Sequence, residues 1–178
     1  MRVIRDYEFV EDIDKGASVA IGNFDGVHLG HQSVIDIACN EAMALDAALG
    51  ILTFEPHPRS YFAHQAPAFR LMGSEARATR LEKLGVDLLY EINFNASLSE
   101  LTPEEFARKV ISDGLALKHV VVGADFCFGK GRSGNVADLQ RFGKAMGFGV
   151  TIAPLIAAGL GEVSSTSIRT ALYQGRPR

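Results

Sequence analysis

The stretch from Ser18 to His31 reads SVAIGNFDGVHLGH and joins an apolar run to a turn with three glycines and two histidines. The apolar run is typical of a strand that is buried on both faces, as in a parallel sheet. The glycines that follow allow the backbone to approach a ligand closely. A helix that begins after such a turn offers unpaired N–H groups and the positive end of its dipole to a phosphate. This segment therefore predicts a strand, an anion-binding turn and a helix in succession.

The same alternation of strand and helix continues along the chain. After the first strand at 18–24, short apolar runs predict further strands at 49–54, 86–94, 119–123 and 149–154. Helices are expected between and after them, at His31–Leu49, at Ser74–Leu84, from Pro103 onward, from Asn135 to Gly147, and from about Ser165 to Tyr173. Five repeats of this alternation predict an α/β fold with a mainly parallel five-stranded sheet and helices on both faces.

Two helix starts carry strong local signals. Thr102, Pro103 and Glu105 occupy the N-cap, N1 and N3 positions of a capping box. Asn135 is a second N-cap residue. These side chains satisfy backbone N–H groups that the first turn of a helix leaves without partners. The starts of these two helices are therefore predicted to within a residue.

The composition bounds the class of protein. The 178 residues suit one domain spanning 1–178, and 47% hydrophobic with 22% charged residues is ordinary for a folded chain. Eighteen Lys and Arg against 21 Asp and Glu give a net charge of −3, which argues against a nucleic-acid partner. No signal peptide, membrane-length apolar run or CxxC pair is present, so we expect a cytoplasmic protein without a membrane partner. The sequence gives no indication of the oligomeric state.

The first candidate site is the turn at 22–31, because ligands of parallel α/β sheets bind at the carboxyl ends of the strands. His28 and His31 lie three residues apart and share a helix face, where imidazoles can donate hydrogen bonds to phosphate oxygens. Two other interpretations are ordinary packed histidines and a zinc pair. The next zinc-ligating residue on this helix, Cys39, lies about 12 Å further along the axis at 1.5 Å per residue. One zinc tetrahedron cannot take both groups.

The second candidate site is VSSTSIR at 163–169. The hydroxyl residues Ser164, Ser165 and Thr166 crowd a helix start, and Arg169 follows in the first turn. Hydroxyls and backbone N–H groups can hold a phosphate, and a guanidinium can bind it through two hydrogen bonds. Alone, this segment is equally well explained as a helix cap with a solvated arginine. Two anion-binding helix starts in one small domain indicate a polyphosphate ligand.

Two apparent nucleotide motifs fail. The stretch 129–134 matches GxGxxG, but the strand before it ends at Gly123 and no Asp or Glu occurs from 139 to 161. The stretch 123–130 resembles a Walker A loop, but it has five residues between its glycines, and Gly131 stands where Ser or Thr belongs. Neither a dinucleotide fold nor a P-loop is predicted.

The motifs together resemble a known family. GNFDGVHLGH at 22–31, TFEPHPR at 53–59, VVGADFCFGKGRSGN at 121–135 and VSSTSIR at 163–169 are similar, in order and spacing, to the adenylyltransferase module of bacterial FAD synthetase. That family is the bifunctional riboflavin kinase/FMN adenylyltransferase. The two phosphate motifs alone indicate the nucleotidylyltransferase superfamily with its Rossmann-like fold, and EPHP and GADFCFG narrow the resemblance to the flavin branch. Small departures are Val163 for a usual Ile and Asn135 for an expected Asp. The C-terminal riboflavin kinase domain of the family is expected to be absent.

The resemblance implies a reaction and a nucleotide site. A phosphate oxygen of FMN would attack the α-phosphorus of ATP to give FAD and pyrophosphate, with Mg²⁺ offsetting charge on the leaving group. His28 and His31 would contact the triphosphate, and Arg169 would hold the β- and γ-phosphates. Asn23 and Asp25 would either order the turn or reach the metal. The implied ATP-binding set is completed by Gly22, Phe24, Gly30, Ser164, Ser165 and Thr166.

The flavin is expected at the loops that follow two other strands. Prolines stiffen one loop, and phenylalanine rings offer flat apolar faces to an isoalloxazine ring. The implied flavin-binding residues are Pro56, Pro58, Phe62, Asp125, Phe126 and Phe128. Ordinary core packing explains each phenylalanine equally well. His57 and His64 are expected to be surface residues.

Two alternative functions stay open at the level of the sequence. One is a nucleotidylyltransferase that uses a different phosphate acceptor. The other is a flavin- or nucleotide-binding protein without catalysis. The flavin-branch segments argue against the first alternative, and the two intact phosphate motifs argue against the second.

Overall fold

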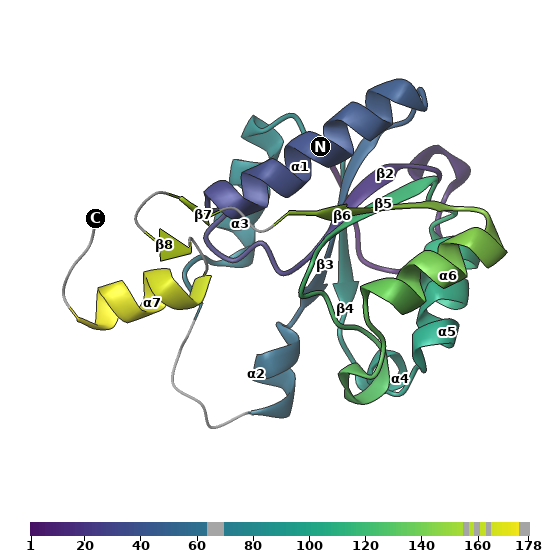
Figure 1. The fold of residues 1–178 in the computed structure, drawn as a ribbon. Helices are drawn as coiled ribbons and strands as arrows, with labels where there is room; N and C mark the ends of the chain where they lie inside the picture. The colour runs from purple at the N-terminus through teal and green to yellow at the C-terminus, as the bar shows by residue number, and fades with distance from the viewer. Residues whose placement is uncertain (64–69, 155–156, 159–160, 163–164, 175–178) are drawn as a thin grey trace.

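A parallel sheet runs through the centre of the computed structural model, which describes residues 1–63, 70–154, 157–158, 161–162 and 165–174 (Figure 1). The sheet has six strands in the order β1-β4-β3-β2-β5-β6, and every neighbouring pair is parallel. The strands are β1 Arg2–Ile4, β2 Ser18–Ile21, β3 Leu49–Glu55, β4 Leu88–Asn93, β5 His119–Gly123 and β6 Gly149–Ala153. A separate antiparallel pair consists of β7 Ala157–Ala158 and β8 Gly161–Glu162. The predicted α/β class and parallel sheet are confirmed.

The sheet has one strand more than the five expected. The additional strand, β1, is three residues long and pairs with β4, with Arg2 opposite Leu88 and Ile4 opposite Tyr90. Three residues are too few to show the alternation or the apolar run that identifies a strand in sequence. The pairing depends on a contact with a segment more than eighty positions away, which local patterns do not encode.

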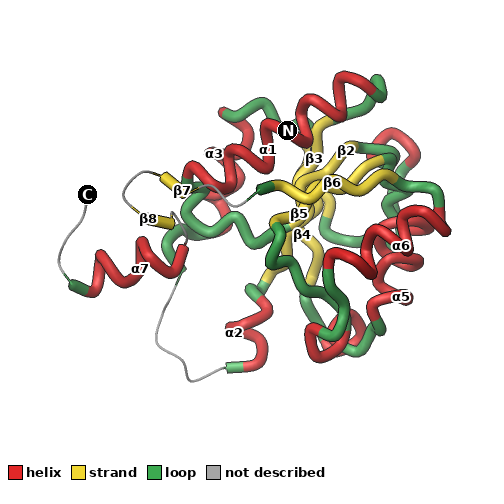
Figure 2. Tube along the Cα trace, viewed as in Figure 1, coloured by secondary structure: helices red, strands yellow, loops and turns green. Residues whose placement is uncertain are grey.

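Helices cover both faces of the sheet, as predicted (Figure 2). Successive side chains of β2 show the two faces. Val19 and Ile21 belong to the core that contains Phe106 of α5, whereas Ala20 packs with Ile35 of α1. The α-helices are α1 Leu29–Ala44, α2 Pro58–Phe62, α3 Ser74–Lys83, α4 Ala96–Ser99, α5 Pro103–Phe106, α6 Val136–Met146 and α7 Ser165–Tyr173. Short 3₁₀ turns lie at Asp12–Asp14 and Lys130–Arg132, and a π-helical segment, Ala107–Gly114, continues α5.

The helix ends follow their local signals with one exception. Both capping boxes form, at Thr102 with Glu105 and at Asn135 with Asp138. The first helix was expected to extend to Leu49, and this was wrong, because α1 ends at Ala44 and Leu49 begins β3. The apolar spacing continues across the boundary, but Asp46 has a φ of +48°, which breaks the helix.

The strand order places the topological switch point of the sheet, here called the crevice, at the carboxyl ends of β2 and β5. From β2 the chain moves to β3 and β4 on one side of the sheet, then returns to β5 and β6 on the other. The connections that leave β2 and β5 therefore diverge at their carboxyl ends, which is where ligands of open α/β sheets bind. The turn at 22–31 follows β2, so the fold positions the first candidate site at this crevice.

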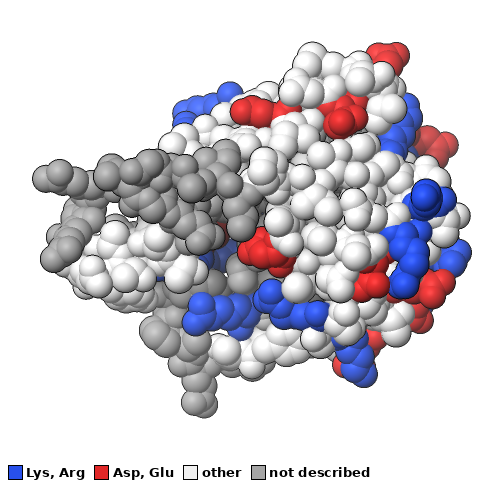
Figure 3. Space-filling model, viewed as in Figure 1, with Lys and Arg blue, Asp and Glu red and all other residues white. Residues whose placement is uncertain are grey.

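Within the described residues, no helix is long and apolar enough to cross a membrane. On the face drawn in Figure 3, Lys and Arg side chains lie interspersed with Asp and Glu among uncharged surface.

Candidate functional site

The turn between β2 and α1 is fixed by its own buried side chains. Phe24 and Val27 are 1% and 2% exposed and pack in the core between α1 and the sheet, although their φ angles are +50° and +40°. Such angles cost a non-glycine residue about 1–3 kcal/mol. Burial of the Phe24 ring and of the Val27 methyl groups must therefore offset this backbone strain. Gly26 also has a positive φ, +81°, and a Cβ there would approach Leu71 to 3.0 Å. The turn thus has a defined shape before any ligand binds.

His28 and His31 stack on each other at the start of α1. Their ring centroids lie 3.6 Å apart with an interplanar angle of 20°. His28 is the N-cap residue, and its Nδ1 accepts a hydrogen bond from the backbone N–H of His31 at 3.4 Å. A neutral imidazole that accepts through Nδ1 carries its proton on Nε2, so His28 presents an N–H donor at the other end of the ring.

Both imidazoles are neutral near pH 7. Burial, and next the neighbouring His28, lower the pKa of His31 to about 3. Burial also lowers the pKa of His28, against the opposing effect of Asp25. Nδ1 of His31 is buried and has no hydrogen-bond partner among the described residues. Because buried polar atoms are nearly always paired, this atom is a candidate contact for a ligand.

Asp25 connects the turn to α7. Its carboxylate is 4% exposed and accepts hydrogen bonds from the backbone N–H groups of Leu71, at 2.9 Å, and Met72, at 3.1 Å. Nη2 of Arg169 lies 2.5 Å from the same carboxylate, in an ion pair that is largely shielded from water. The two motifs that the sequence identified separately therefore meet at Asp25. Of the two roles left open for Asp25, the contacts support ordering of the turn.

The other expected ATP-binding residues lie in or beside this turn. Gly22 directly follows β2, the side chain of Asn23 is exposed, and Gly30 is in the first turn of α1. Thr166 is exposed on the first turn of α7. Ser164 and the side chain of Ser165 lie outside the described residues. Their contacts with ATP stay predictions.

The flavin residues expected near β3 include one exposed aromatic ring, that of Phe62. Pro56 is exposed, and Pro58 begins α2. Phe62 is 69% exposed, and its ring lies 5.8 Å, edge to face, from that of Phe94 at the end of β4. Tyr61 stands 5.2 Å from the same Phe94 ring. An exposed phenylalanine beside the crevice is available to a planar ligand, and the flavin contact stays a prediction.

The flavin residues after β5 differ in exposure. Asp125 is exposed, while Phe126 is half-buried and stacks on Phe128 with centroids 5.5 Å apart and ring planes 12° apart. Phe128 is 6% exposed and also packs against Phe106 and Phe142. Core packing accounts for the Phe128 ring without a ligand, whereas Phe126 has accessible surface. Neither contact with flavin is tested by these positions.

His57 is not the surface residue that we expected. It is half-buried, and its Nδ1 accepts a hydrogen bond from the backbone N–H of Arg59 at 3.0 Å, which caps α2. Burial, and next the positive charge of Arg70, lower its pKa to about 4. The sequence analysis did not recognise His57 as the N-cap of α2. His64 lies outside the described residues.

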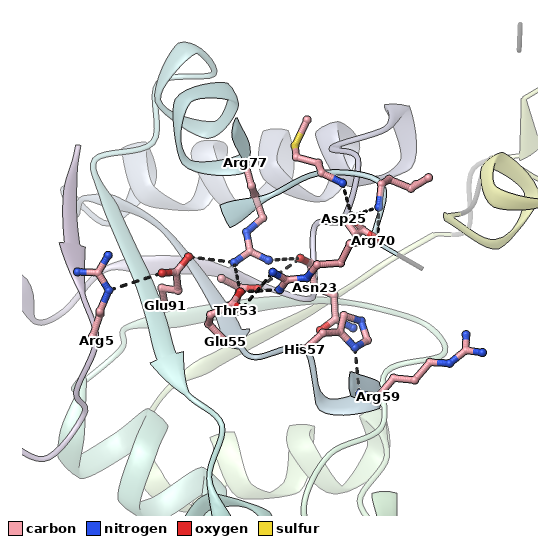
Figure 4. A network of polar contacts seen from close by, with 12 residues as sticks. Arg5, Asn23, Asp25, Thr53, Glu55, His57, Arg59, Arg70, Arg77 and Glu91 are labelled. Carbon is pink, nitrogen blue, oxygen red and sulfur yellow. Dashed lines mark hydrogen bonds and ion pairs between the residues drawn. The ribbon is translucent and has the colours of Figure 1, made fainter. Parts of the chain in front are cut away.

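A partly buried ionic network beside the turn has no counterpart in the sequence analysis (Figure 4). Arg77 of α3 pairs with Glu91 of β4 at 2.9 Å and with Glu55 of β3 at 3.3 Å. Arg70 pairs with Glu55 through two hydrogen bonds of 3.0 and 2.5 Å. One signal was available: Arg77 lies four positions before Leu81, the buried apolar residue of α3, and so occupies the core-facing side of the helix.

The described residues do not build a magnesium site of their own. No three His, Cys, Asp or Glu side chains in this part of the chain converge as metal ligands. Asp25 is the one carboxylate in the turn, and both its oxygens accept hydrogen bonds from protein groups. Magnesium commonly binds through substrate phosphates and one or two carboxylates. The side chains present fit an ion delivered with phosphates and do not fit a preformed protein cage.

The sheet order, the His-x-Gly-His turn at its centre and the arginine of α7 define a protein with the nucleotidylyltransferase-like α/β fold. The chain belongs to the FAD synthetase family, whose sequence profile matches residues 10–167. This confirms the resemblance seen in the sequence motifs.

Individual relatives agree with the family assignment. A bifunctional riboflavin kinase/FMN adenylyltransferase from Listeria monocytogenes is 38% identical over 92% of this chain and 51% of its own length. A protein of the same name from Haemophilus influenzae is 36% identical over 97% of this chain and 56% of its own. An FAD synthetase from Listeria monocytogenes is 37% identical over 90% of this chain and 65% of its own. The chain thus spans about half the length of the first two relatives.

A solved structure supports the fold. A Streptococcus pneumoniae protein described as a macrolide-efflux protein has a TM-score of 0.82 and 26% identity, over 98% of this chain and 57% of that one. The match extends over nearly the whole of this chain, so the observed arrangement of sheet and helices occurs in a known structure.

Proposed function

We propose that this chain transfers the adenylyl group of ATP to FMN, giving FAD and pyrophosphate. The observation that carries the proposal is the ion pair between Asp25 and Arg169, because it joins the two anion-binding helix starts at one crevice. Membership of the FAD synthetase family supports the choice of substrates. The names of the half-length relatives point to the same transfer, and the activity is proposed for this chain on that basis.

The reaction needs positioning and charge stabilisation more than a protein nucleophile. An FMN phosphate oxygen, already anionic, attacks the α-phosphorus of ATP in line, and the bond to the bridging oxygen of pyrophosphate breaks. Neutral His28 and His31 donate hydrogen bonds to the triphosphate, with His31 nearer the α-phosphate. Such donors stabilise charge that develops in the transition state. Magnesium, held by the ATP phosphates, offsets charge on the leaving pyrophosphate.

Arg169 binds the β- and γ-phosphates in this proposal. A guanidinium has five N–H donors in a planar fork, so one arginine can contact a carboxylate and a phosphate together, and Arg169 already contacts Asp25. The hydroxyls of Ser164, Ser165 and Thr166 complete the phosphate site. The flavin ring lies against the loops after β3 and β5, with Phe62 and Phe126 as the accessible rings.

The test is incubation of the purified chain with ATP and Mg²⁺ and with either FMN or riboflavin. We expect FAD and pyrophosphate from FMN and no product from riboflavin. His31→Gln should lower the turnover number on the order of 10²–10³-fold, if His31 stabilises transition-state charge. His119→Gln is the matched control, because His119 is a half-buried histidine at the start of β5, the opposite end of that strand from the crevice. Binding of both substrates without pyrophosphate release would contradict the proposal, as would equal activity of the two variants.

A further inference from the structure

The backbone carbonyl of Asn23, in the turn after β2, is held by two side chains from other elements. Nη1 of Arg77, on α3, donates a hydrogen bond to it at 3.2 Å. Oγ1 of Thr53, on β3, donates a second at 3.3 Å. A carbonyl has two lone pairs, so this acceptor is fully used. The position of the first residue of the turn after Gly22 is therefore set from α3 and β3.

Arg77 is itself held in one orientation by a buried charge network (Figure 4). It is 2% exposed, and its Nη2 lies 2.9 Å from Glu91 and 3.3 Å from Glu55. Arg70 pairs with Glu55, and the exposed Arg5 lies 3.6 Å from Glu91. The planar guanidinium thus joins the adjacent strands β3 and β4 to the turn that follows β2. A lysine ammonium at this position is a point charge and cannot repeat the planar fork.

The segment that carries Arg77 also holds the next part of the turn. The N–H groups of Leu71 and Met72 donate to Asp25, two residues beyond Asn23. His28 follows three residues later as the N-cap of α1. The segment 70–77 therefore controls the turn at two points, and both precede the stacked imidazoles.

We propose that Arg77 is a positioning residue for the adenylyl transfer site. It touches no substrate, and it acts by fixing the carbonyl of Asn23, and through the turn the imidazoles of His28 and His31. The inference rests on the proposed function for its effect on turnover, but its effect on the turn is independent of that function. A displacement of about 1 Å at a reacting group can cost 10²-fold in rate, so loss of this anchor should be visible in catalysis.

The first experiment compares Arg77→Lys with Arg141→Lys, an exposed arginine that pairs with Asp138 on α6, away from the network. We expect Arg77→Lys to lower the turnover number about 10- to 100-fold, with a smaller change in the KM for ATP. Arg141→Lys should leave both unchanged. Hydrogen exchange of a peptide spanning 22–31 should accelerate about 10-fold or more in Arg77→Lys, because one charged hydrogen bond to the turn is lost. A peptide from α6 should show no change.

The second experiment separates positioning from stability. Arg77→Met alone leaves the buried Glu91 with the exposed Arg5, at 3.6 Å, as its remaining ion-pair partner among the described residues, and this variant is expected to fold poorly. Arg77→Met with Glu91→Gln removes both charges, and Glu55 keeps its two hydrogen bonds to Arg70. The double variant should regain most of the melting temperature lost by Arg77→Met. Its turnover number should stay below that of the wild-type chain, and amide hydrogens in the peptide spanning 22–31 should still exchange faster than in the wild-type chain.

The outcomes distinguish the two proposals. If the wild-type chain makes no FAD, the proposed function fails, while exchange of the 22–31 peptide still tests Arg77. If the wild-type chain is active and Arg77→Lys changes neither turnover nor exchange, the positioning role is wrong. Recovery of turnover together with melting temperature in the double variant would also overturn it, because Arg77 would then contribute stability alone.

Discussion

Replacement of His31 by glutamine should make the protein less sensitive to acid. The pKa of His31 in the folded chain is about 3, mainly because the ring is buried, against 6.5 for an unperturbed histidine. Between these two values the unfolded chain binds a proton that the folded chain does not. Stability contributed by neutral His31 is therefore fully present above pH 6.5 and is lost as the pH falls toward 3.

The magnitude follows from the distance between the assay pH and the unfolded pKa. At pH 5.0 the unfolded histidine is 1.5 units below its pKa of 6.5. At about 1.36 kcal/mol per unit, the free energy of unfolding should fall by about 2 kcal/mol relative to pH 7.5. The same result holds for any folded pKa below about 4, because His31 then stays neutral at pH 5.0. Glutamine has no charge at either pH and loses nothing by this route.

Urea unfolding at pH 7.5 and 5.0 measures the difference. The chain has no tryptophan, so far-ultraviolet circular dichroism is the suitable signal. The wild-type chain should lose about 2 kcal/mol more than His31→Gln over this interval. Effects of histidines outside the His28–His31 stack cancel because both proteins contain them in the same surroundings. Equal m-values would show that the same surface unfolds in each protein. Equal losses of stability in the two proteins would refute the buried, neutral state of His31.

Three further substitutions test the site and its supports. Arg169→Ala should raise the KM for ATP about 10- to 100-fold, the value of charged hydrogen bonds to phosphate, and an unchanged KM in steady-state assays would remove Arg169 from the ATP site. Phe128→Ala should lower the free energy of unfolding by about 3–5 kcal/mol, as measured in urea, because its ring is buried among aromatic neighbours. If Phe128 also contacts flavin, the KM for FMN should rise more than that for ATP. Thr102→Ala should cost about 1 kcal/mol of stability through loss of the capping box, and Thr102→Ser should restore most of it.

The elements that could be predicted from sequence are those with a local physical cause. Thr102 and Asn135 begin their helices because their side chains bond the N–H groups of the first turn. Gly147 ends α6 at a φ of +88°, which glycine adopts without a Cβ penalty. The strand β1 and the end of α1 were missed, because the first depends on pairing with β4 and the second on a positive φ at Asp46.

The candidate site divides in the same way. The histidines and the arginine could be chosen from their residue types and their places at helix starts. The contacts that bring the site together could not be predicted, since Asp25 and Arg169 are 144 positions apart in the sequence and Arg77 and Asn23 are 54 apart. Those distances are closed by the sheet order, because β2 lies between β3 and β5.

This difference between local and long-range causes explains why the sequence motifs identified the phosphate-binding turn but not the network around Arg77. A turn that binds phosphate must present glycine and imidazole at fixed spacing, so the residues that bind the phosphate lie close together in the sequence. A residue that positions the turn needs only to reach one carbonyl from a neighbouring helix, and an arginine on any packed helix face can do so. Arg77 is recognisable once its fork is seen to bond Asn23, Glu55 and Glu91 together, because a buried guanidinium without such partners would be strongly destabilising.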